Sequence, residues 1–66
     1  MEENHLMDQV RVVVETLPSE QQASLHMAYF EGLTHTEISE RTGTPLGTVK
    51  TRIRSALTAV RRALEA

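Results

Sequence analysis

The chain has 66 residues, a formal charge of −2 at pH 7 and no cysteine. This length allows one small domain and is too short for a buried catalytic pocket on its own scaffold. The composition excludes disulfides and cysteine-based zinc sites, and since neither a membrane-spanning apolar run nor a signal-peptide pattern occurs, we expect a cytoplasmic protein.

The charges are divided unevenly along the chain. Residues 1–40 hold eight acids and one base, whereas residues 41–66 hold six bases and one acid. This division permits a nucleic-acid contact in the second half and a contact with a basic protein in the first half. Because the acidic half repels phosphates as well, we expect the isolated chain to bind DNA weakly.

The first predicted element is a helix over residues 3–17. Its apolar residues follow the helical spacing i, i+4, i+7, i+8 and i+11, and they are Leu6, Val10, Val13, Val14 and Leu17. The residue before a proline is biased away from helix, so Pro18 ends this element.

A second helix is predicted over residues 19–31. Ser19 and Gln22 have the spacing of a capping box at its start, and Gly32 ends it as a left-handed cap followed by the apolar Leu33. Apolar residues lie on more than one side of this helix. We expect Tyr29 in the core, whereas Met27 and Phe30 suit the core and an exposed patch for a partner helix equally well.

Two further helices are predicted over residues 35–42 and 45–64. Thr34 and Glu37 form a second capping box, and Gly43 ends the short helix. We expect Thr44 to cap the long helix and Pro45 to be its first residue. A short helix, a glycine turn and a longer helix have the spacing of a helix-turn-helix.

The long helix has two different faces. An apolar stripe runs along one of them and consists of Leu46, Val49, Ile53, Ala56, Leu57, Val60, Ala63 and Leu64. The remaining positions are polar or small, and residues 45–64 contain five cations and no acid. A solvated face normally mixes charges of both signs, so this pattern favours a polyanion as partner over a merely solvated basic face.

Three segments, LPSEQQ, AYFEGLTHTEISE and GTPLGTVKTRI, together resemble region 4 of bacterial sigma factors of the extracytoplasmic-function (ECF) group. The resemblance implies that residues 1–66 form a single all-α domain of four helices with a C-terminal helix-turn-helix and no wing. It implies that the last helix reads the promoter −35 element and that apolar surface docks the flap of RNA polymerase. Full members of the family also carry region 2, so we expect the chain to be one domain of such a protein.

The roles that this resemblance implies for individual residues agree with the chemistry of those residues. Backbone amides at Gly47 and Thr48 suit a phosphate, and Arg54 suits a bidentate contact with guanine. The expected DNA contacts are Thr36, Arg41, Gly47, Thr48, Lys50, Thr51, Arg54 and Ser55. The expected partner-binding residues are Val12, Met27 and Phe30.

Two other functions are compatible with the same pattern. One is an interaction module whose basic face receives an acidic anti-sigma factor, and the other is a LuxR-type helix-turn-helix regulator that dimerises through its last helix. Catalysis has little support, since His5, His26 and His35 lack metal-binding spacing and Ser19 has no histidine beside it. We therefore expect no enzyme activity, no cofactor and no metal.

Overall fold

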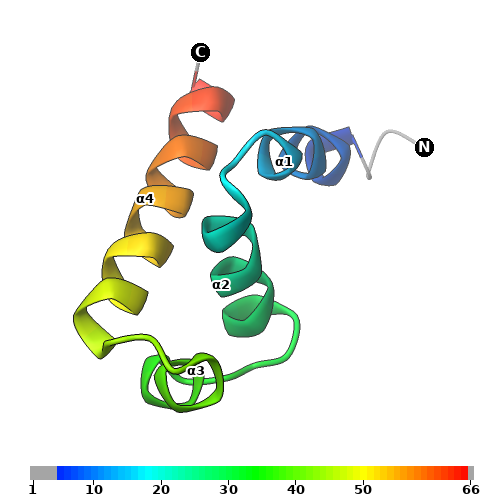
Figure 1. The fold of residues 1–66 in the computed structure, drawn as a ribbon. Coiled ribbons are helices and arrows are strands. Elements are labelled where there is room, and N and C mark those ends of the chain that lie inside the picture. The colour runs from blue at the N-terminus through cyan, green and yellow to red at the C-terminus, as the bar shows by residue number, and fades with distance from the viewer. Residues whose placement is uncertain (1–4, 66) are drawn as a thin grey trace.

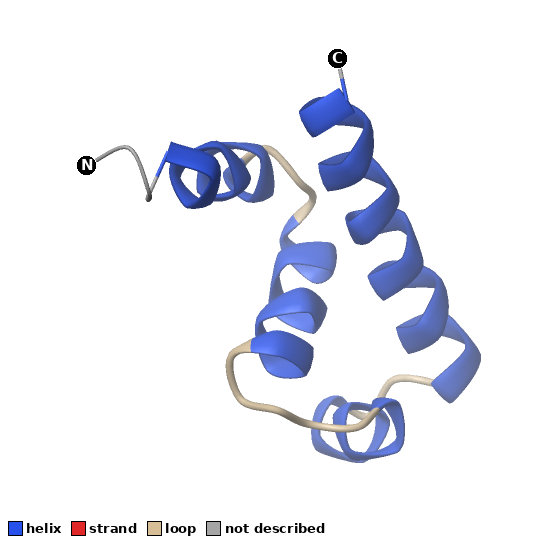
Figure 2. Cartoon of the chain, turned by 180° about the vertical axis from the view of Figure 1, so that it is seen from behind, coloured by secondary structure: helices blue, strands red, loops and turns tan. Residues whose placement is uncertain are grey.

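The computed structural model describes residues 5–65, which form four helices, the last of which is the longest and lies beside the other three (Figure 1). The helices are α1 (His5–Glu15), α2 (Ser19–Tyr29), α3 (His35–Thr42) and α4 (Leu46–Glu65). Seen from behind, the described loops are confined to the junctions between helices (Figure 2). No strand occurs in residues 5–65, and the all-α prediction is confirmed. No helix in this range is long and apolar enough to cross a membrane.

Two apolar clusters hold the helices together, and α2 and α4 contribute to both. The first cluster joins α1, α2 and α4 and consists of Leu17, Leu25 and Ala56, with Val14 and Ala59 packed against it. The second joins α2, α3 and α4 and consists of Ile38, Val49 and Ile53, with Met27, Ala28 and Leu33 packed against it. Because α4 lies in both clusters, its sequence positions the other three helices.

The centre of the predicted stripe on α4 is buried, but its edge is not. Val49 and Ala56 are fully buried and Ile53 is 4% exposed, whereas Leu46, Leu57 and Leu64 are 37%, 41% and 38% exposed. The uncovered part reflects the different lengths of the two helices: α4 has 20 residues, whereas α2, which packs along it, has only 11. A partner this short cannot cover the full length of the stripe, so Leu46 and Leu64 near the two ends of α4 stay partly exposed, and Leu57 lies at the edge of the stripe.

The junction between α1 and α2 differs from the prediction. The N-cap of α2 is Pro18, and it has no side-chain capping bond, so the expected Ser19–Gln22 capping box is wrong. The Gln22 side-chain amide instead donates to the carbonyl of Leu17 at 2.8 Å and to that of Glu15 at 3.3 Å. Gln22 therefore satisfies carbonyls at the end of α1, because Pro18 moves Ser19 inside the first turn of α2.

The ends of the first two helices also shift by a few residues. The predicted start of α1 at residue 3 lies outside the described residues, and α1 ends at Glu15 because the next two amides make tighter bonds of 3.0 Å to Val13 and Val14. α2 ends at Tyr29 instead of residue 31. Gly32 has a φ of 70°, which confirms its predicted left-handed conformation.

Candidate nucleic-acid interface

The start and the end of α3 are fixed by residues that the sequence identifies. The Thr34 hydroxyl accepts from the Glu37 amide at 3.1 Å, and the Glu37 carboxylate accepts from the Thr34 amide at 2.8 Å, so the predicted capping box is confirmed. At the other end Gly43 has a φ of 65°, which an L side chain rarely adopts. These two features define the first helix of the helix-turn-helix.

The turn between α3 and α4 is closed by Ser39, which sequence reasoning missed. The Ser39 hydroxyl donates to the Thr44 carbonyl at 2.6 Å, and the Thr44 amide donates to the Ser39 carbonyl at 3.2 Å. The predicted capping role of Thr44 is wrong, because α4 begins at Leu46 and its first backbone bond runs from Val49 to the Pro45 carbonyl at 3.0 Å. A serine inside a helical pattern carries no signal that distinguishes this role from a solvated one.

The structure leaves every predicted DNA-contacting side chain accessible. Thr36 and Arg41 are exposed on α3, and the other six are exposed in the N-terminal half of α4. Gly47 has no neighbouring atom within 4 Å of where a Cβ would stand, so the backbone there is open to a ligand. The major groove of DNA is wide enough to admit an α-helix, so exposed polar side chains on one helix can reach base edges there.

The first turn of α4 presents unpaired backbone amides. The first backbone bond at the start of α4 is donated by Val49, so the amides of Gly47 and Thr48 precede it. This turn contains no acidic residue. Since the N-terminal end of a helix carries partial positive charge, the turn favours an anion such as a backbone phosphate.

Thr51 is oriented by its own helix. Its hydroxyl donates to the Gly47 carbonyl at 3.0 Å, which occupies its only hydrogen. The oxygen lone pairs remain available, so in this conformation Thr51 can accept a hydrogen bond from a ligand but cannot donate one.

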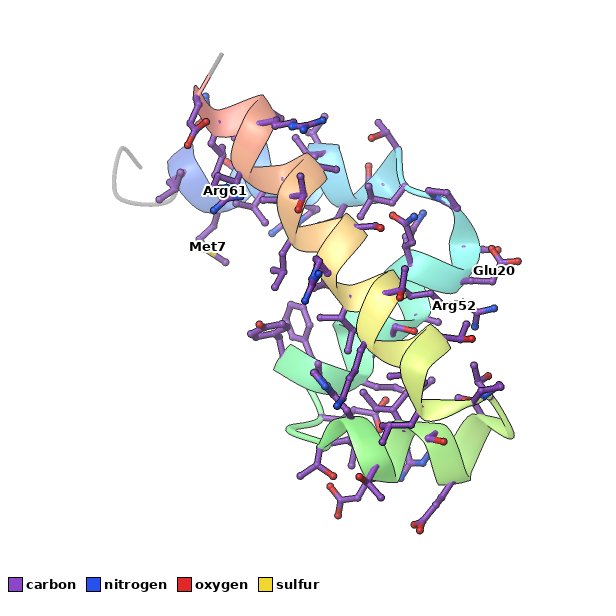
Figure 3. The ribbon with its side chains drawn as sticks, turned by 90° about the vertical axis from the view of Figure 1, so that its left-hand side faces the viewer. Met7, Glu20, Arg52 and Arg61 are labelled. Atoms are coloured by element: carbon purple, nitrogen blue, oxygen red, sulfur yellow. The ribbon has the colours of Figure 1, made fainter. Side chains whose placement is uncertain are left out.

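The five cations of α4 do not share one side of the helix. Arg61 and Arg52 project from opposite sides of α4, Arg61 towards the side on which Met7 lies and Arg52 towards that of Glu20 (Figure 3). Arg52 is half-buried, whereas Lys50 and Arg54 are exposed. Only part of the positive charge is therefore available to one ligand at a time.

A groove runs beside the Lys50 side of α4 and includes residues that sequence reasoning missed. Lys50, Arg54 and Arg61 line it together with Tyr29 and His35. Tyr29 is 63% exposed, so its predicted place in the core is wrong. His35 carries no periodicity signal, and only the fold brings the first residue of α3 next to α4.

Arg41 lies apart from this groove. Its Nη1 donates to Oε1 of Glu31 at 2.5 Å, and the two side chains are 55% and 38% exposed. Thr36 is five residues earlier on the same helix and therefore about 140° away around its axis. The structure thus does not bring Arg41 together with Thr36, and its predicted DNA contact stays a prediction.

The three predicted partner-binding residues do not form one surface. Val12 is 61% exposed on α1, and Phe30 is 77% exposed just after the end of α2. In Figure 1, α1 adjoins the beginning of α2, at the other end of that helix from Phe30. Met27 is half-buried and packs against the second cluster. Phe30 stacks on His26 with ring centroids 5.1 Å apart, which gives an exposed aromatic pair.

No group of three or more metal-ligating side chains is found within the described part of the chain. A ligand can therefore use three features: the exposed polar side chains in the N-terminal half of α4, the unpaired amides in its first turn, and the adjoining groove.

Comparison with known proteins identifies this arrangement. The family model described as "Sigma-70, region 4" matches residues 7–60. The ECF RNA polymerase sigma factor RpoE of Cereibacter sphaeroides is 50% identical over 46 residues, which cover 70% of this chain and 25% of the relative. The ECF RNA polymerase sigma factor SigK of Mycobacterium ulcerans is 42% identical over 62 residues, which cover 89% of this chain and 33% of the relative.

A further SigK, from Mycobacterium tuberculosis, is 36% identical over 52 residues, or 79% of this chain and 28% of the relative. The chain therefore spans about a quarter to a third of the length of these curated relatives.

Proposed function

Because the chain belongs to the sigma-70 region 4 family, we propose that it is the promoter-recognition module of a transcription initiation factor and that it binds the −35 element. The observation that carries this proposal is the exposed polar half of α4, which contains no acid and follows a turn closed by Ser39. Thr36 and the Gly47 and Thr48 amides position the helix on phosphates. Lys50, Thr51, Arg54 and Ser55 read base edges.

Selection from a library of duplexes at low salt tests this function. We expect the chain to enrich one short sequence and to bind it more tightly than a scrambled duplex of equal length. Low salt is needed because phosphate contacts dominate affinity and weaken steeply as salt rises. Equal affinity for all duplexes would contradict promoter recognition and leave only non-specific binding.

We also propose that Phe30 docks the flap of RNA polymerase, as the resemblance implies. The support is the 77% exposure of this large apolar side chain, which has its ring stacked on His26 and no place in either apolar cluster. A partner helix would bury this aromatic pair. A module with these two partners works in the cytoplasm.

An anti-sigma factor is a second candidate partner, and the groove beside α4 favours it. Exposed Tyr29, Leu57 and Leu64 line this groove next to Lys50 and Arg61. An amphipathic helix with acidic edges would match both the apolar floor and the basic rim. Competition between such a helix and −35 DNA would support this partner, and simultaneous binding of both would count against it.

A further inference from the structure

Helix α3 has a single fully buried anchor. Ile38, near its middle, is the buried residue of this helix and packs with Val49 and Ile53 of α4. With one buried anchor at its centre, the orientation of α3 also depends on polar contacts near its ends. Ser39 and Thr44 link its C-terminal end to α4, so a contact with α2 has to come from another residue. The N-terminal end carries Thr36, and the C-terminal end leads through the turn into α4.

Glu31 supplies a side-chain link from the end of α2 to the last turn of α3. Its Oε1 accepts from Arg41 Nη1 at 2.5 Å, and its Oε2 lies 3.4 Å from Nδ1 of His26. One carboxylate thus contacts two basic groups that belong to different helices. The reversal of the chain at Gly32, with a φ of 70°, makes this approach possible.

The position of Glu31 is unfavourable without these partners. It lies just beyond the end of α2, where the partial negative charge of the helix dipole repels a carboxylate. Arg41 lies in the last turn of α3, where a cation is favourable. Pairing with Arg41 therefore offsets the repulsion of Glu31 at the end of α2. It also keeps a cation at the end of α3, where the helix dipole favours positive charge.

We propose that Glu31 is a positioning residue for DNA binding: it braces α3 against α2 through Arg41 and so places the N-terminal end of α3 and the turn beside α4. This inference rests on the proposed function. It assigns a supporting role to an acidic residue, although removing an acid from a DNA-binding protein normally strengthens its attraction to phosphate.

The sign of the effect provides the test. In anisotropy titrations of the full chain with its selected −35 duplex, Glu31→Ala should lower affinity about two- to five-fold, the range of an exposed pair. The matched control is Glu40→Ala, an exposed acid on α3, which should leave affinity unchanged or raise it. Equal behaviour of the two variants would overturn the brace.

Exchange of the two charges separates bracing from a direct contact of Arg41 with DNA. Glu31→Arg and Arg41→Glu should each weaken binding, and the double variant should return to within about two-fold of the parent. If the double variant binds no better than Arg41→Glu alone, the pair does not act as a brace. The charge exchange still tests the brace if Glu31→Ala is too unstable to be titrated with DNA.

The salt dependence of Arg41→Ala gives an independent outcome. A brace leaves the number of phosphate contacts unchanged, so the slope of log affinity against log salt should stay constant. A slope that becomes shallower by about one unit would mark Arg41 as a phosphate contact and overturn the proposal.

Arg54→Ala tests the proposed function itself. If it reduces affinity while Glu31→Ala behaves like Glu40→Ala, only the brace fails; if Arg54→Ala has no effect, the proposed interface fails.

Discussion

Arg54 lies on the exposed side of α4, one turn after Lys50, and lines the same groove. Its planar guanidinium suits O6 and N7 of guanine, so we expect Arg54→Ala to weaken binding to the cognate −35 sequence by about 1–3 kcal/mol. Discrimination at one base pair should be lost as well. The measurement is a set of titrations with duplexes altered one position at a time.

Arg62→Ala is the matched control for this variant, since Arg62 is also exposed but lies two turns further along α4. It should weaken binding less and equally on all sequences. A uniform loss for Arg54→Ala would identify Arg54 as a phosphate contact instead of a base contact.

Phe30 is the most exposed large apolar side chain of the described residues, at 77%. Phe30→Asp should therefore abolish binding to the polymerase flap while leaving the DNA affinity and the melting temperature of the chain nearly unchanged. Both affinities need to be measured on the same folded variant. Loss of both together would show that Phe30 supports the fold.

At the scale of the helices, α4 is held through the centre of its stripe. Ile53 is 4% exposed and packs in the second cluster, so Ile53→Ala should lower the free energy of unfolding by about 2–5 kcal/mol. Leu57→Ala is the control, because Leu57 is 41% exposed and should cost clearly less. Thermal denaturation measures both, and equal losses would contradict the observed burial.

The start of α3 gives a second comparison, between two threonines. The Thr34 hydroxyl accepts the capping bond from Glu37 at 3.1 Å, so Thr34→Ala should lower the free energy of unfolding by about 1 kcal/mol. Thr44 precedes α4 without acting as its cap, and Thr44→Ala should have a much smaller effect. A similar loss from both would restore a capping role to Thr44.

For the whole molecule, the split charge predicts different salt responses at its two proposed binding sites, the polar positions of α4 and Phe30. Arg52 points away from Arg61, so three or four of the five cations of α4 can reach phosphates together. The slope of log DNA affinity against log salt should then be about −3 to −4. Apolar docking at Phe30 should persist as salt rises, since burial of apolar area is not screened. Equal salt sensitivity of both would mean that the polymerase contact depends on charge.

Local signals predicted most of the fold. Gly43 and the Thr34–Glu37 box mark the ends of α3 through conformations and bonds that involve only neighbouring residues, and they are found where predicted. Gly32 has its predicted left-handed conformation, but α2 already ends at Tyr29 with Phe30 as its C-cap. Ser19 and Thr44 fail as caps for the opposite reason. Their roles depend on how two helices meet, and there Gln22 and Ser39 supply the bonds instead.

The candidate site divides in the same way. Helical periodicity alone predicted that the six contact positions of α4 face solvent, and the structure leaves them exposed. Periodicity could not show that Tyr29 leaves the core or that His35 lines a groove with Lys50, because both depend on the angle between helices.

The sequence by itself therefore determined the four helices, the Thr34 and Gly43 boundaries of α3 and the polar positions of α4, because these follow from interactions within a few residues. Tertiary structure alone decided which part of the apolar stripe is covered, that Tyr29 and His35 lie beside α4, and that Glu31 meets both His26 and Arg41. These features depend on the packing of α2 and α3 against α4, which joins residues far apart in the chain and leaves no periodic pattern.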